Sequence, residues 1–154
     1  MSRALRIRTA RAGDAQTIAL YNMAMAQETE RLPLDRKTVL GGVKIVLGDR
    51  ARGRYFVLEK EGRIRAQLLV TMEWSDWRSA YFWWIQSVYV PPGDRGRGYF
   101  RKLFDHVRRQ AAREGSCGLR LYTARRNRAA KRIYRRLGME PSIYDMYELC
   151  GSML

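Results

Sequence analysis

The stretch SVYVPPGDRGRGYFRKLF, residues Ser87–Phe104, places a strand end, a glycine loop and a helix start next to one another. Val88–Val90 is β-branched and aromatic, which is typical of a strand, and the two prolines after it stop any strand ladder. A loop of mixed glycines and arginines follows. This order suits a bound phosphate, because glycine amides approach the anion and a helix N-terminus adds its positive dipole end. The helix is indicated by apolar residues at helical spacing: Phe100, Leu103, Phe104, Val107 and Ala111.

Two familiar phosphate loops do not match this stretch. A P-loop ends in Gly-Lys-Ser or Gly-Lys-Thr, whereas Gly98 is followed by Tyr99 and Phe100. The dinucleotide fingerprint requires a third glycine at the position of Arg101. A basic surface turn that caps an ordinary helix is the alternative that needs no ligand. The residues of the loop alone leave both interpretations open.

Composition and length predict one globular domain over residues 1–154. The chain is 46% hydrophobic, and no apolar run approaches the roughly 18 residues of a membrane span. Its first residues lack the apolar stretch of a secretory signal, so a cytoplasmic protein is expected. Cys117 and Cys150 have no metal-ligand spacing and are interpreted as two reduced, buried thiols; no metal site is expected.

The formal net charge of +15 favours anionic partners. Nucleic acid and coenzyme A, with its several phosphate charges, are both candidates, and a general bias toward arginine is a third explanation. The arginines are spread along the chain and are densest at 95–109 and 125–136. Because there is no separate basic arm, the distribution argues against a dedicated nucleic-acid tail.

The remaining sequence predicts an α+β fold, with a mixed, mostly antiparallel sheet flanked by about four helices. Asp14 and Asp35 are placed to cap the first two helices. The strand before the glycine loop and the strand after the next helix form a βαβ unit, so these two strands are expected to be parallel. Strands are expected at 5–9, 55–59, 64–73, 80–90, 119–123 and 142–149, and helices at 15–28, 36–47, 100–111 and 128–137.

A second motif lies downstream, Asn127-x-x-Ala130-x-x-x-Tyr134-x-x-Leu-Gly-Met139. With Arg95-x-x-Gly98 upstream, it resembles the two coenzyme-binding segments of the GCN5-related N-acetyltransferases (GNAT), whose loop pattern is Arg/Gln-x-x-Gly-x-Gly/Ala. The order of the motifs and the helix and strand between them also match. The sequence departs from the pattern at Phe100, where the family usually has Gly or Ala.

The resemblance implies a single GNAT-like domain that transfers an acetyl group directly from acetyl-CoA to a primary amine, without a metal. It implies that loop amides hold the pyrophosphate, and that Val88–Val90 pairs with the pantetheine arm where two strands splay at a bulge. The acceptor is a small-molecule or protein amine, and the family also admits a homodimer. The implied coenzyme-binding residues are Val88, Tyr89, Val90, Arg95, Gly96, Arg97, Gly98, Tyr99, Phe100, Asn127, Ala130 and Tyr134.

The resemblance further implies that Tyr134 protonates the leaving thiolate, although its spacing alone favours a core tyrosine. The backbone N–H near Val88 would polarise the thioester carbonyl. Many relatives carry a glutamate base on the strand before the loop, where this chain has Gln86 and Ser87. Glu30 is the first choice of base, and the other candidates are Glu28, Glu73 and Asp76.

Two other functions remain open from the sequence. A basic nucleic-acid-binding module on the same fold would use the net charge, and a regulator that binds acyl-CoA without catalysis would explain the missing strand carboxylate. Nucleic acid and membrane are not expected as partners. His106 is interpreted as structural, and most of the four tryptophans as core residues.

Overall fold

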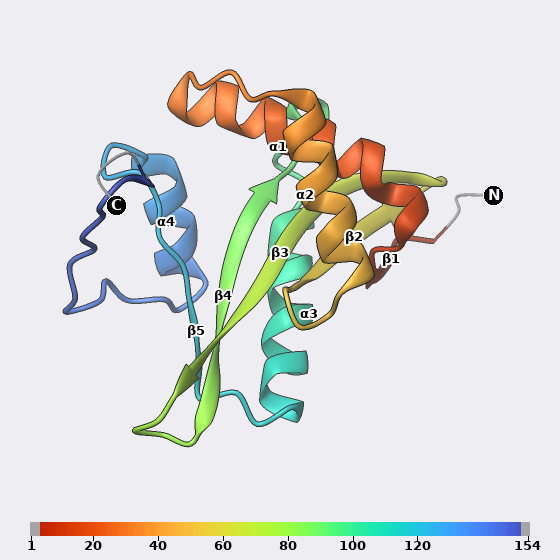
Figure 1. The fold of residues 1–154 in the computed structure, drawn as a ribbon. Helices are drawn as coiled ribbons and strands as arrows, with labels where there is room; N and C mark the ends of the chain where they lie inside the picture. Colours follow the sequence, from red (N-terminus) through yellow and green to blue (C-terminus); the bar gives the residue numbers. More distant parts are fainter. Residues whose placement is uncertain (1–3, 152–154) are drawn as a thin grey trace. The chain divides into compact units, whose positions relative to one another are not determined.

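The computed structural model describes residues 4–151. Its centre is a five-stranded sheet in the order β1-β2-β3-β4-β5 (Figure 1). Neighbouring strands are antiparallel from β1 to β4, and β4 and β5 are parallel, as the βαβ pattern predicted. The strands are β1 (Arg6–Thr9), β2 (Arg54–Lys60), β3 (Arg63–Ser75), β4 (Ala80–Tyr89) and β5 (Gly118–Arg120).

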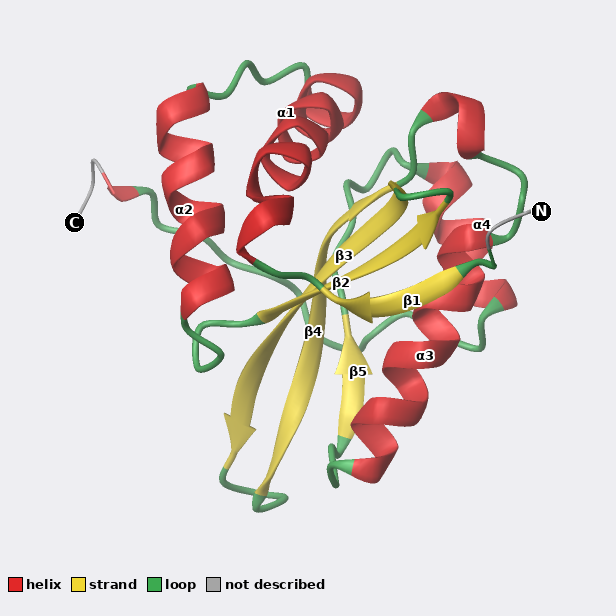
Figure 2. Cartoon of the chain, turned by 90° about the vertical axis from the view of Figure 1, so that its right-hand side faces the viewer, coloured by secondary structure: helices red, strands yellow, loops and turns green. Residues whose placement is uncertain are grey.

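Helices cover both faces of this sheet. α1 (Ala15–Glu30) and α2 (Arg36–Gly48) lie on one face, and α3 (Tyr99–Arg113) lies on the other (Figure 2). The α1–α2 side has an apolar cluster that includes Ile18, Val43 and Val57. The α3 side buries the helix face formed by Tyr99, Leu103, Phe104, Val107 and Ala111. Full burial of each larger apolar side chain stabilises the fold by about 1.5–3 kcal/mol. Apolar packing on both faces therefore holds the helices against the sheet.

Local signals account for most element ends. The β2–β3 hairpin turns at Glu61 and Gly62, which both have positive φ, as a two-residue hairpin requires. Asp35 caps α2, because its carboxylate accepts a hydrogen bond from the Thr38 amide at 2.8 Å. Gly41 and Gly42 lie inside α2 without interrupting it. The two 3₁₀ turns are η1 (Ala12–Asp14) and η2 (Pro92–Asp94).

The chain forms two compact units, Met1–Tyr122 and Thr123–Leu154. The second unit contains α4 (Arg128–Arg136). Asn127 caps this helix by accepting a hydrogen bond from the Ala130 amide at 3.0 Å, and Gly138 follows it with φ of 85°. Both predicted ends of the helix are therefore confirmed. A single domain over 1–154 stays a prediction.

The predicted strand at 142–149 is wrong. This segment has irregular backbone and exposed side chains, among them Ile143 and Tyr147. A strand needs a hydrogen-bonded neighbour, and the described part of the second unit contains only α4 as a regular partner element. A local run of apolar and aromatic residues cannot supply that neighbour.

Three smaller expectations are also corrected. Asp14 does not cap α1, because its carboxylate binds the Arg8 guanidinium and accepts from the Arg11 amide. The β3–β4 turn is shorter than expected, since Trp74 and Ser75 belong to β3. Both cysteines are free thiols, but neither is fully buried, since Cys117 is half-buried and Cys150 is exposed. No helix among residues 4–151 is long and apolar enough to cross a membrane.

Candidate functional site

A bulge interrupts β4 just before the glycine loop. Gln67 of β3 is paired with Tyr89, whereas Leu69, two residues later, is paired with Gln86. β4 therefore has one more residue than β3 across this interval. Ser87 lies in the bulge with φ of 50°, a left-handed conformation that a serine adopts only when its surroundings hold it there.

A buried polar network lies against the bulge on the α1 side. Gln67 is completely buried; its Nε2 donates to the Asn22 Oδ1 at 2.7 Å and to the Ser87 carbonyl at 3.3 Å. Asn22 Nδ2 donates to the Tyr55 hydroxyl at 3.0 Å. Burial raises the pKa of Tyr55, while hydrogen bonds with Asn22 and the Ser87 side chain act in the opposite direction. Ser87 is thus held through both its carbonyl and its side chain.

The two parallel strands separate beyond Trp84. β4 and β5 are paired at Phe82, Trp83 and Trp84 only, and β4 continues to Tyr89. The bulge and the end of β4 therefore lie past the last β5 pairing. This confirms the splayed strand pair that the family resemblance implied.

The glycine loop presents backbone donors at the start of α3. Gly96 and Gly98 have φ of 74° and 73°, and a Cβ built on either would meet no atom within 4 Å. Among the described residues, the amides of Gly96, Arg97 and Gly98 donate no hydrogen bond to another protein group. No acidic side chain lies in the first turn of α3. Free amides, a helix N-terminus and surrounding arginines together fit a phosphate group.

Arg95 has a structural role in this loop. Its amide donates to the Pro92 carbonyl at 3.3 Å, and its Nε donates to the Val90 carbonyl at 2.9 Å. Its Nη2 pairs with Glu28, at the C-terminal end of α1, at 2.5 Å. The predicted coenzyme residue Arg95 therefore joins the loop to β4 and α1, and its amide is already engaged.

Glu28 also accepts a hydrogen bond from Tyr89 at 2.8 Å. Burial and this carboxylate raise the pKa of Tyr89 to about 12. Burial alone would raise the pKa of Glu28, but the hydrogen bonds from Arg95 and Tyr89 outweigh it and lower that pKa. A lowered pKa makes Glu28 a weaker base, so this candidate is better suited to holding the loop than to removing a proton.

The helix residue Phe100 lies differently from its predicted core position. Phe100 is half-buried against Phe104, with ring centroids 6.1 Å apart, while Tyr99 is 6% exposed. The buried face of α3 therefore starts at Tyr99. Phe100 occupies the position at which the family usually has a small residue, and its side chain lies against Phe104 of the same helix.

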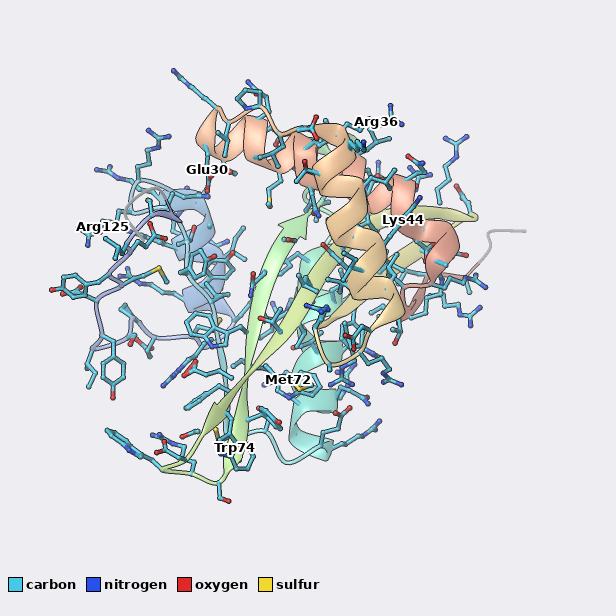
Figure 3. All side chains as sticks on the ribbon, in the orientation of Figure 1. Glu30, Arg36, Lys44, Met72, Trp74 and Arg125 are labelled. Atoms are coloured by element: carbon cyan, nitrogen blue, oxygen red, sulfur yellow. The ribbon has the colours of Figure 1, made fainter. Side chains whose placement is uncertain are left out.

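The other carboxylates expected as candidate bases are distributed over the first unit. Glu73 on β3 accepts from the Trp84 indole at 2.6 Å and pairs with Arg120 at 3.3 Å. Asp76 lies in the β3–β4 turn, directly after the last residue of β3. Glu30 is exposed at the C-terminal end of α1 (Figure 3) and, among residues 4–151, makes no side-chain hydrogen bond or ion pair.

Tyr134, Asn127 and Ala130 belong to the second unit. Tyr134 lies on α4 and is half-buried, and burial raises the pKa of its phenol. The Asn127 side chain is occupied by the helix cap described above. Among the described residues, no group of three or more His, Cys, Asp or Glu is placed to hold a metal ion.

The residue that sequence reasoning missed is Gln67. It lies within the run Ala66-Gln67-Leu68-Leu69-Val70, where every neighbour is apolar and buried. A single amide inside such a run must find hydrogen-bonding partners, because burial of an unpaired polar group is costly. The single polar residue inside this apolar run was the available signal. Only the folded structure shows that its partner, Ser87, lies in the bulge.

Comparisons with known proteins agree with this geometry. The model of the "Acetyltransferase (GNAT) family" matches residues 17–139. A search of curated proteins found no match. Among solved structures, a possible acetyltransferase from Clostridium difficile 630 is 40% identical, with 96% of this chain and 97% of that chain covered and a TM-score of 0.90.

More distant structures share the fold. A ribosomal-protein-alanine N-acetyltransferase from Brucella melitensis biovar Abortus 2308 is 17% identical, covers 96% of this chain and 99% of its own, and has a TM-score of 0.77. A predicted acetyltransferase with acetyl-CoA from Clostridium acetobutylicum is 15% identical, covers 96% of both chains and also has a TM-score of 0.77. The family match over most of the sequence, together with the splayed sheet and the glycine loop, shows that this chain belongs to the GNAT acetyltransferase family.

Proposed function

We propose that this protein transfers an acetyl group from acetyl-CoA directly to a primary amine of a small molecule or a protein. The observation that carries the proposal is the glycine loop at the N-terminus of α3, whose Gly96, Arg97 and Gly98 amides have no hydrogen-bond partner within residues 4–151. Such a site favours an anionic pyrophosphate over a neutral ligand. Coenzyme A carries that group, and family membership supports the choice among phosphate ligands.

In this proposal the loop amides from Gly96 to Phe100 bind the pyrophosphate. Arg95 contributes by fixing the loop against β4 and α1, since its amide and guanidinium are already engaged. The end of β4, with Val88 to Val90, runs beside the pantetheine arm. The Val90 carbonyl already accepts a hydrogen bond from the Arg95 side chain. Asn127 and Ala130 start the helix that presents Tyr134.

The transfer needs three groups from the protein. The Val88 amide polarises the thioester carbonyl as the tetrahedral intermediate forms. Glu30 accepts the proton of the amine through water. Its exposed carboxylate has no partner in the described part of the chain, which supports this choice over Glu28 and Glu73, which are hydrogen-bonded. Tyr134 donates a proton to the thiolate of coenzyme A.

The role of Glu30 as the base can be tested by replacing it with glutamine, which cannot accept the proton of the amine. This variant should have a lower kcat, and an unchanged kcat would remove Glu30 from this role.

The coenzyme site is tested by thermal unfolding with and without acetyl-CoA. A ligand at about 100 times its Kd should raise the melting temperature by about 5–10 °C. Gly98→Glu should abolish this rise, because the substitution puts a carboxylate among the phosphate-binding amides and a side chain on a residue with φ of 73°.

Two controls separate charge and strain from loss of the site. Gly98→Ala introduces the strained side chain without the carboxylate and should retain part of the ligand-induced rise. Gly13→Glu makes the same charge change in η1, where a Cβ meets no atom within 4 Å, and should retain all of it. A wild-type protein that is not stabilised by any acyl-CoA would contradict the proposed function.

A further inference from the structure

The Ser87 bulge is held by side chains that do not themselves reach the glycine loop. A left-handed serine is strained, and such strain persists only where several contacts fix the residue. Here the contacts are Gln67 to the Ser87 carbonyl and the hydrogen bond between the Tyr55 and Ser87 side chains. Asn22 connects Gln67 and Tyr55, so the three side chains form one clamp.

The orientation of the Gln67 amide follows from its partner. A carbonyl oxygen only accepts hydrogen bonds, so the atom of Gln67 that faces the Ser87 carbonyl must be the Nε2 donor. The Gln67 Oε1 is then left buried without a hydrogen-bond partner in the protein. An apolar residue of the same volume would remove this unpaired oxygen, but it would also take the Nε2 donor away from the Ser87 carbonyl and the Asn22 Oδ1. The glutamine is therefore matched to the bulge rather than to the apolar strand that contains it.

The bond to the Ser87 carbonyl also fixes the next amide. The Ser87–Val88 peptide is planar and trans, so its N–H points opposite to its C=O. Because the carbonyl points to the Gln67 side chain, the Val88 N–H points away from it. β4 has no β5 partner at this position, since the pairing ends at Trp84. The clamp thus orients one backbone donor at the end of β4, on the side where the β5 pairing has ended.

We propose that Gln67 is a positioning residue for acyl transfer: by holding the Ser87 carbonyl, it aims the Val88 N–H at the thioester carbonyl of the acyl-coenzyme A. Asn22 orients Gln67 from α1 within the same clamp. This inference rests on the proposed function. It adds that the Val88 N–H, the donor of the oxyanion hole, is oriented by the Gln67 side chain on the opposite side of the bulge. Gln67 acts through Val88 and does not touch the substrate.

The test compares Gln67→Met with the wild-type protein. Methionine keeps the volume and removes the donor, so the Ser87–Val88 peptide can rotate. We expect kcat to fall about ten- to a hundredfold, with little change in the KM for acetyl-CoA. Binding supplies a second readout, which uses coenzyme A and a ketone analogue of acetyl-CoA in which a methylene replaces the sulfur. The variant should lose the preference for the ketone over coenzyme A, because only the ketone offers a carbonyl to the Val88 N–H.

The matched control is Val43→Ala, which makes a cavity in the same α1-side core from α2 and leaves the strand partners of Gln67 unchanged. It should lower the melting temperature and leave the ketone preference unchanged. If Gln67→Met does not fold, Asn22→Ala releases the Gln67 amide from α1 and should reduce kcat and the ketone preference in the same direction.

The outcomes distinguish the two proposals. A wild-type protein that transfers acetyl groups, with a Gln67→Met or Asn22→Ala variant that keeps both kcat and the ketone preference, would overturn the positioning role and leave the proposed function intact. A wild-type protein that binds no acyl-coenzyme A would overturn both. An equal loss of ketone preference in Val43→Ala would also overturn the positioning role, because general loosening of the core would then explain it.

Discussion

In the proposed mechanism the Tyr134 phenol donates a proton, and this phenol stays protonated at neutral pH. Burial raises its pKa above the ordinary value of about 10, so the acid form persists through the physiological range. We expect Tyr134→Phe to lower kcat about a hundredfold with little change in the Kd for acetyl-CoA. The ratio of wild-type to variant kcat should be constant between about pH 6 and pH 9, because the phenol is protonated throughout that range.

The measurement is a steady-state pH profile of both proteins, with coenzyme binding followed separately by calorimetry. A matched control is Tyr144→Phe, which removes a phenol from the exposed segment after α4. Tyr144→Phe should leave kcat unchanged. Equal activity of Tyr134→Phe and wild type at every pH would remove Tyr134 from the mechanism.

Single residues were easiest to interpret from the sequence where their roles are local. Asn127 and Gly138 mark the ends of a helix through their own backbone, and the structure has them in those places. Gln67 has a partner twenty positions away, in a bulge whose register depends on β3 and β4 together. Its role could not be predicted from the strand pattern, because a one-residue change of register would point the amide to the other face.

At the scale of one element, α2 offers a direct test of a helix cap. Asp35 accepts from both the amide and the hydroxyl of Thr38, and these hydrogen bonds lower the pKa of Asp35. Asp35→Ala should lower the melting temperature by about 2–4 °C at pH 7. Asp35→Asn retains an acceptor and should lose less.

The pH dependence of this effect has a definite sign. Because the folded pKa of Asp35 is below its unfolded value of about 3.9, the stabilisation is complete above that value and is lost as the pH falls through the folded pKa. The difference in melting temperature between wild type and Asp35→Ala should therefore narrow from pH 5 to pH 3. A difference that stays constant over this range would show that the charged carboxylate does not contribute.

Helices and strands could be predicted from the sequence where the strands that pair with one another lie close together along the chain. The β2–β3 hairpin has its turn and both strands within 54–75, and the parallel pairing of β4 with β5 follows from the intervening α3. The segment 142–149 contains apolar and aromatic residues, such as Ile143, Tyr144 and Tyr147, and has no paired strand. Such residues favour a strand locally, but they carry no information about whether a neighbouring strand is present.

At the scale of the whole molecule, the net charge of +15 should act on the coenzyme before it binds. Exposed charges attract a multiply charged anion over distances comparable to the Debye length, which is about 8 Å at physiological ionic strength. The same charge attracts nucleic acid without a dedicated site, so weak binding to RNA that disappears with added salt would not indicate a nucleic-acid function. A useful experiment must separate this general attraction from the loop contacts.

Salt dependence with two acetyl donors makes that separation. Acetyl-CoA carries the nucleotide phosphates, whereas acetyl-pantetheine offers the same thioester without them. Between about 50 and 300 mM NaCl we expect the KM for acetyl-CoA to rise about three- to tenfold, because salt screens the attraction of the phosphates, with kcat nearly constant. The KM for acetyl-pantetheine should be high and should not change with salt, since in the proposed site its neutral chain would contact only the end of β4. If salt raised both KM values equally, the positive charge would be acting on the acceptor or on the fold, and phosphate attraction would not explain the basic composition of this chain.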